Sequence, residues 1–158
     1  MDNVVINPAY ASEIQRKEKP AIIQVHVKIA IFQNSLHSPQ DAKTPIRLFE
    51  KTFPISQRPN QGMRFTLPVG RTVAPEEGIR LEHTSVSRTQ GYIILFIESG
   101  AKEPYFYYED TSTFGSLLNG FRFCKDTKPL RNNDRIGIGL YPDEITPVYT
   151  LEFHYSIF

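Results

Sequence analysis

The sequence predicts an all-β fold, an antiparallel sandwich of two sheets, and three observations lead to this prediction. Twelve prolines and nine glycines interrupt the 158 residues often, so the apolar stretches between them are short. Those stretches are rich in Ile, Val, Phe and Tyr, which are the residues that strands favour. Two stretches alternate strictly between apolar and polar residues, which is the pattern of a strand with one buried face.

The two alternating stretches lie near the two ends of the chain. Residues 24–31 and 149–157 each place an apolar side chain at every odd position. Residues 92–97 are apolar at every position, which is typical of a central strand that is covered on both faces. Shorter apolar stretches predict further strands at residues 48–53, 64–69, 79–82, 105–108 and 135–140.

The segments between these strands are predicted to be loops. Residues 34–44 and 55–62 are mostly polar and are expected at the surface. Residues 11–19 favour a helix but carry one large apolar residue, Ile14, so nothing would hold such a helix against a core. The sequence therefore predicts a short flexible extension over residues 1–20 and one domain over residues 21–158.

Charge and composition make several classes of protein unfavourable. Eighteen basic residues against seventeen acidic ones give a net charge of +1, whereas proteins that bind nucleic acid through its phosphates are usually basic. No apolar run approaches the roughly 18 residues of a membrane span, and the first residues lack the features of a signal peptide. One cysteine, Cys124, cannot form an internal disulfide, so we expect a reducing compartment: the nucleus, or alternatively the cytoplasm.

No arrangement of residues predicts catalysis. The four histidines are scattered, and the sequence has no GxSxG, no HExxH and no phosphate-binding loop followed by Lys-Ser/Thr. We therefore expect neither an enzyme nor a metal, a cofactor or a small-molecule substrate.

Four polar segments lie between predicted strands and are the informative part of the sequence. They are Gly70-Arg71 and residues 84–90, 110–120 and 129–139. Two arginines, Arg71 and Arg88, and the hydroxyls of Ser87, Thr89 and Thr113 would form a small anion receptor if these loops met. Guanidinium groups and hydroxyls suit phosphate oxygens, and each charge-assisted hydrogen bond contributes roughly 1.5–3 kcal/mol.

The order of these segments resembles the forkhead-associated (FHA) domain. That family has Gly-Arg, then Ser-Arg-x-His, then Ser-Thr-x-Gly-Thr-x-x-Asn-Gly, then Leu-x-x-Gly-Asp-x-Ile-x-x-Gly. The matching residues here are Gly70-Arg71, Ser87-Arg88-Thr89-Gln90, Ser112-Thr113-x-Gly115-Ser116-x-x-Asn119-Gly120 and Leu130-x-Asn132-Asn133-Asp134-x-Ile136-x-Ile138-Gly139. The longer N-terminal part looks like the variant in fungal FHA proteins of the ubiquitin-ligase and septation-checkpoint type, which act in signalling, the cell cycle and the DNA damage response.

The resemblance implies an eleven-strand sandwich whose loops bind phosphothreonine peptides, so the expected partners are phosphothreonine-containing proteins. By this resemblance Arg71 would hold the phosphate, Ser87 would donate a hydrogen bond to it and Arg88 would add a second positive charge. Thr113 would line the pocket and order the peptide backbone. The residues expected to shape the loops are Gly70, Gly115, Asn119 and Gly120.

This sequence departs from the family pattern at three positions. Gln90 replaces a histidine that braces the loops, and an amide can also donate and accept hydrogen bonds. Phe114 stands where an asparagine often binds the peptide backbone, so a polar contact is replaced by an apolar one. Asn133 replaces a glycine, and asparagine tolerates a left-handed backbone.

Two alternatives remain open from the sequence. One is a degenerate FHA scaffold that makes constitutive protein contacts independent of phosphorylation. The other is a nucleic-acid module in which aromatic residues at 105–108 and 121–123 stack on bases, although aromatic residues in strands more often belong to a core.

Overall fold

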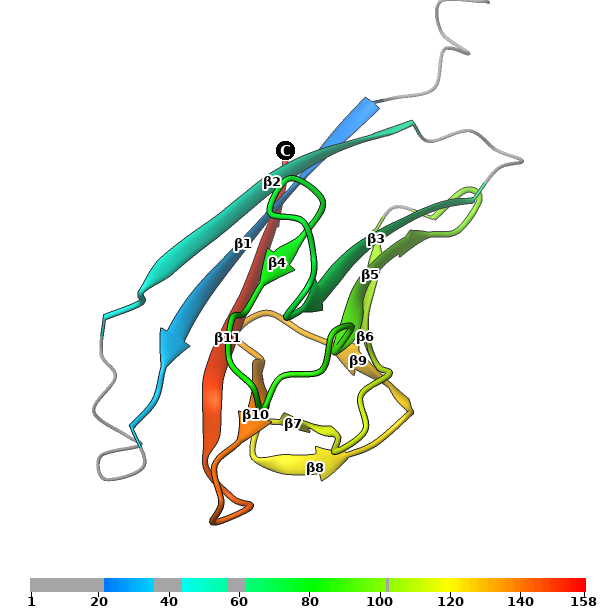
Figure 1. The fold of residues 1–158 in the computed structure, drawn as a ribbon. Coiled ribbons are helices and arrows are strands. Elements are labelled where there is room, and N and C mark those ends of the chain that lie inside the picture. The colour runs from blue at the N-terminus through cyan, green and yellow to red at the C-terminus, as the bar shows by residue number, and fades with distance from the viewer. Residues whose placement is uncertain (1–21, 36–43, 57–61, 102) are drawn as a thin grey trace, which may run out of the picture.

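The fold is a sandwich of two β-sheets, seen in a computed structural model that describes residues 22–35, 44–56, 62–101 and 103–158 (Figure 1). The predicted extension over residues 1–20 lies outside the described residues. One sheet has the order β2 (Arg47–Ser56), β1 (Ile22–Gln33), β11 (Pro147–Ile157), β10 (Arg135–Leu140), β7 (Ser116–Leu118) and β8 (Phe121–Phe123). The other has the order β4 (Ile79–Arg80), β3 (Met63–Gly70), β5 (Gly91–Ile97), β6 (Tyr105–Asp110) and β9 (Thr127–Leu130).

The prediction of an all-β antiparallel sandwich of about eleven strands is confirmed. The two sheets contain nine strand pairs, and only β3 and β4 run parallel, with Val69 opposite Ile79. Within the described residues every other strand pairing is antiparallel, and these residues contain no helix.

The alternating stretches form strands, as predicted, and they are neighbours inside the six-stranded sheet. β1 pairs with β2 on one side and with β11 on the other, and Ile29 lies opposite both Phe49 and Phe153. The odd-numbered apolar side chains of β1, from Val25 to Ile31, are at most 2% exposed. They pack against the second sheet, where β5 is the middle strand and buries Ile93 and Ile94 on opposite faces.

Two of the predicted loops begin inside the fold. The stretch 55–62 was expected at the surface, but Ile55 belongs to β2 and is fully buried. The stretch 34–44 begins with Asn34, which is only 7% exposed. Its Nδ2 donates to the Pro147 carbonyl at 3.0 Å and to the Thr150 Oγ1 at 2.8 Å, so this polar side chain is buried with its hydrogen bonds satisfied.

We expect Asn34→Ala to lower the free energy of unfolding by about 1–3 kcal/mol, because buried polar groups of β11 lose their partner. Urea denaturation of the two proteins measures the difference. The neighbouring Gln33 is exposed, so Gln33→Ala is the matched control and should change stability by no more than about 0.5 kcal/mol. Equal stability of Asn34→Ala and the parent would show that these bonds do not hold β1 to β11.

Candidate anion-binding site

The loops that follow β3, precede β5 and follow β6 meet at one end of the five-stranded sheet. Together they form a hollow of about 430 Å³, lined by Arg71, Thr84, Ser85, Val86, Ser87, Arg88, Thr89, Thr111, Thr113 and Phe114. The resemblance predicts ligand contact at Arg71, Ser87, Arg88, Thr113 and Phe114. All of these residues line this one hollow.

Gly70 allows the first two loops to approach closely. A Cβ at this position would lie 2.2 Å from the carbonyl oxygen of Arg88, far inside van der Waals contact. Without it, the Arg71 N–H donates to the Ser87 carbonyl at 3.0 Å and the Thr72 N–H donates to the Arg88 carbonyl at 3.2 Å. The glycine therefore places Arg71 beside Ser87 and Arg88.

The lining of the hollow carries positive charge and hydroxyl donors. Nε of Arg71 is buried and has no hydrogen-bond partner within the described residues. The Ser87 Oγ accepts the Thr113 N–H at 3.4 Å, which leaves the hydroxyl hydrogen of Ser87 free to donate to a ligand. No acidic residue occurs among the described residues that line the hollow, so the arrangement favours an anion.

Gln90 braces the loops from beneath. Its side chain is 1% exposed, and its Oε1 accepts the Ser87 N–H at 3.0 Å. Its Nε2 donates to the Gly115 carbonyl at 2.9 Å and to the Ser116 Oγ at 3.0 Å. One amide thus links two loops by acting as acceptor and donor, and Gln90 is not among the residues that line the hollow.

Asp110 holds the third loop, a role that was not predicted from the sequence. The carboxylate is 1% exposed, and its Oδ1 accepts the hydroxyls of Ser112 and Ser116, each at 2.7 Å. Its Oδ2 accepts the Lys125 N–H at 2.8 Å. An aspartate at the end of a strand often accepts hydrogen bonds from the loop that follows, and this position was the signal that could have revealed the role of Asp110.

Tyr108 completes this buried network. Its hydroxyl lies 2.9 Å from the Ser116 Oγ. Burial raises the pKa of the Tyr108 phenol, so the group stays neutral and keeps its hydrogen for a hydrogen bond.

Four residues in the loops of this region have a positive φ. Gly115 has φ of +93°, and a Cβ there would lie 2.6 Å from the Phe123 carbonyl oxygen. Asn119 and Gly120 have φ of 50° and 87° and form the tight turn between β7 and β8. Asn133 has φ of 71°, the left-handed conformation expected where it replaces glycine.

Phe114 lies at the rim of the hollow with 66% of its surface exposed. Its backbone is held from β8, because Nε of Arg122 donates to the Phe114 carbonyl at 2.9 Å and Nη2 of the same arginine donates to it as well. The ring therefore leaves the hollow open and offers an apolar surface to whatever the hollow binds.

Comparisons with known proteins agree with this fold. Residues 68–139 match the family model of the FHA domain, and the chain therefore contains an FHA domain. Full-length yeast Pml1p is similar in structure with a TM-score of 0.55 at 16% identity, covering 99% of this chain and 98% of that one. The N-terminal FHA domain of S. cerevisiae Rad53p, solved with a phosphothreonine peptide, gives 0.59 at 18% identity, covering 82% and 93%. No curated protein sequence matches the chain.

The described residues show neither a metal cluster nor a spanning helix. No group of three or more His, Cys, Asp or Glu side chains among them could hold a metal ion. The part of the chain that the structure describes also has no helix with the length and apolar character needed to cross a membrane.

We expect Gln90→Leu to lower the free energy of unfolding by about 1–3 kcal/mol, because the Ser87 N–H and the Gly115 carbonyl lose their buried partner. Gln90→His should lose less, since imidazole also offers one donor and one acceptor. Urea denaturation measures both changes. Gln24 lies exposed on β1, so Gln24→Leu serves as the control. If Gln24→Leu lowered the free energy of unfolding as much as Gln90→Leu does, the bracing role of Gln90 would be ruled out.

Proposed function

We propose that the chain is a phosphothreonine-peptide-binding module and that the hollow at Arg71 receives the phosphate. The observation that carries this proposal is the buried Nε of Arg71, which has no partner within the described residues and lies in a hollow lined by Ser87 and Arg88. A buried donor without an acceptor costs free energy, and an anion in the hollow would supply the acceptor.

Phosphate suits this hollow better than a carboxylate. A phosphate monoester carries about −1.5 to −2 charges near pH 7 and has three strong acceptor oxygens. The hollow offers two guanidinium groups, from Arg71 and Arg88, and the free hydroxyl hydrogen of Ser87. A single carboxylate has too few oxygens and too little charge to use all of these donors at once.

The proposed ligand is a phosphothreonine in a partner protein rather than a free metabolite. The family match and the Rad53p domain solved with a phosphothreonine peptide support this choice. Phe114 and Thr84 line the hollow and are exposed, so they could contact the peptide on either side of the phosphothreonine. The module needs no cofactor, metal or catalytic residue, and its net charge of +1 gives nucleic acid and membranes little reason to bind.

The second candidate function is a scaffold that binds protein partners without phosphorylation. The structural likeness to Pml1p favours it, because that likeness covers nearly the whole chain and Pml1 is described as a splicing factor integrated into the RES complex. The open hollow and the unpartnered Arg71 Nε favour the phosphopeptide module.

We further propose a nuclear location, with the cytoplasm as the alternative, and a signalling role in the cell cycle or the DNA damage response. The likeness to a splicing factor and the single free cysteine support the nuclear compartment. Imaging of a fluorescent fusion tests it, and exclusion of the fusion from nuclei would reject it.

We expect Arg71→Ala to weaken phosphothreonine-peptide binding about 100-fold, because the phosphate loses two or more charge-assisted hydrogen bonds. Fluorescence anisotropy with peptides selected from an oriented phosphothreonine library measures the change. Arg64→Ala removes an exposed arginine from β3 outside the hollow and should bind like the parent. Equal binding of phosphorylated and unphosphorylated peptides, or no effect of Arg71→Ala, would favour the scaffold.

We expect Ser87→Ala to weaken the same peptides about tenfold or more, because one donor to the phosphate is lost. The fold should remain, since the Ser87 Oγ accepts one long hydrogen bond, at 3.4 Å, from the Thr113 N–H. Titration of the same peptides gives the ratio of dissociation constants. A ratio near one would remove Ser87 from the proposed site.

A further inference from the structure

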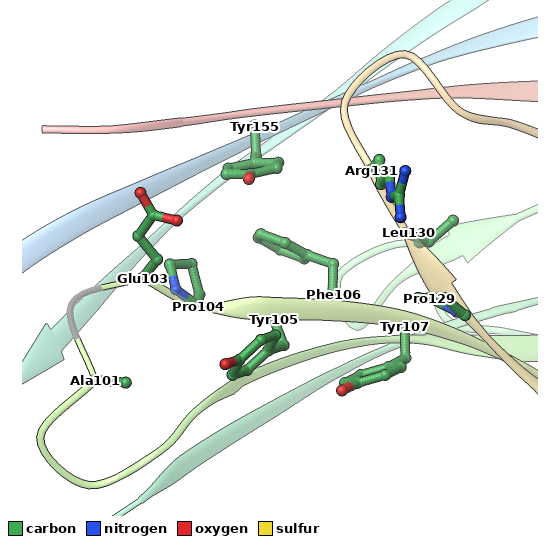
Figure 2. Close-up of a pocket in the computed structure, with 10 residues that line it drawn as sticks. All are labelled: Ala101, Glu103, Pro104, Tyr105, Phe106, Tyr107, Pro129, Leu130, Arg131 and Tyr155. Atoms are coloured by element: carbon green, nitrogen blue, oxygen red, sulfur yellow. The ribbon is translucent and has the colours of Figure 1, made fainter.

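A second hollow lies at the other end of β6 (Figure 2). Its volume is about 710 Å³, and it is lined by Ala101, Glu103, Pro104, Tyr105, Phe106, Tyr107, Pro129, Leu130, Arg131 and Tyr155. It shares no lining residue with the anion site. β6 runs from Tyr105 at this hollow to Asp110 beneath the anion site, so at about 3.3 Å per residue the two sites are roughly 16 Å apart.

The hollow wraps around the edge of β6 where β9 ends. The last residue pair between these strands joins Phe106 to Leu130, so Tyr105 lies beyond the end of β9. Figure 2 shows Phe106 and Tyr155 on one side of β6 and Tyr105 and Tyr107 on the other. A ligand lying along this edge of β6 would therefore be close to aromatic side chains from both sides of the strand.

The tyrosine side chains, rather than Phe106, are available to a ligand. Phe106 is only 4% exposed and belongs to the core, where its ring lies 4.5 Å from the Tyr155 ring between centroids. Tyr105 is 49% exposed, and Tyr107 and Tyr155 are half-buried. No hydrogen bond from within the described residues engages the hydroxyls of Tyr105, Tyr107 or Tyr155. Tyrosine offers an apolar ring and a polar end together, which is why it is enriched at protein interfaces.

Two prolines make this edge less suitable for a peptide that binds as an added β-strand. Pro104 and Pro129 lack an N–H, so this edge offers fewer backbone donors to an added β-strand. A ligand must then be held by side chains. A polyproline II segment has no internal hydrogen bonds, its carbonyls are free to accept from tyrosine hydroxyls, and its rings pack in aromatic grooves.

The two ends of the hollow carry opposite charges. Glu103 stands at one end and Arg131 at the other (Figure 2), and both are exposed. Neither side chain forms an ion pair within the described residues. A ligand with one basic and one acidic end would complement both charges and would be bound in one direction.

We propose that this hollow docks a proline-rich segment of a partner protein in the polyproline II conformation. Its basic end lies at Glu103, its acidic end lies at Arg131, and its prolines pack on Tyr105 and Tyr155. This docking surface is independent of the phosphate site.

The test is fluorescence anisotropy with a labelled polyproline peptide that carries an arginine at one end and an aspartate at the other. Tyr105→Ala should weaken its binding about tenfold. Phe121→Ala is the matched control, because Phe121 is 79% exposed on β8 outside the hollow, and it should bind like the parent. Arg71→Ala should also bind this polyproline peptide like the parent. Failure of the phosphate site and failure of the polyproline site can therefore be told apart.

Charge reversal tests the orientation. Glu103→Arg should weaken the same peptide several-fold, and a polyproline peptide with an aspartate at each end should restore the lost affinity. No binding of polyproline, or equal binding by Tyr105→Ala, would overturn the proposal. So would light scattering that shows a dimer of the parent and a monomer of Tyr105→Ala, because the hollow would then bind a second copy of the chain.

Discussion

The anion site depends on a buried polar network beneath its loops. Gln90 and Asp110, each 1% exposed, bind backbone or hydroxyl groups of the loops around Ser87 and Gly115. A buried carboxylate and a buried amide are tolerated only when their hydrogen bonds are satisfied, so any other arrangement of these loops would leave them unpaired at a high cost. The loops are thus held in place before a ligand arrives, and binding needs little further ordering of the chain.

The two arginines of the candidate site differ from some other arginines of the surface in having no acidic partner among the residues that the structure describes. Arg80 and Arg135 form ion pairs with neighbouring glutamates. Arg71 and Arg88 form no ion pair within the described residues, although the net charge of the whole chain is only +1. The proposed recognition of phosphate would therefore depend on short contacts inside the hollow rather than on a general attraction for anions.

The sequence predicted the long strands and the loops of the site, but only part of how they are held. Strict alternation identified β1 and β11, because a half-buried strand requires it. β7, β8 and β9 were not predicted, since three or four residues are too few to show a period. The roles of Asp110 and Asn34 could not be predicted, because the partners that bury them are distant in sequence. The second hollow could not be predicted either, because it joins β6, β9 and β11, whose adjacency depends on how the sheets stack.

β6 is a rigid spacer between the two hollows, and this fixes how one partner protein could use both. An extended polypeptide advances about 3.3 Å per residue, so a linker of fewer than about five residues could not join a phosphothreonine to a proline-rich segment across roughly 16 Å. A linker slightly longer than this would hold the second segment at a high effective concentration. Two weak contacts would then combine into avidity without any change of shape in the domain.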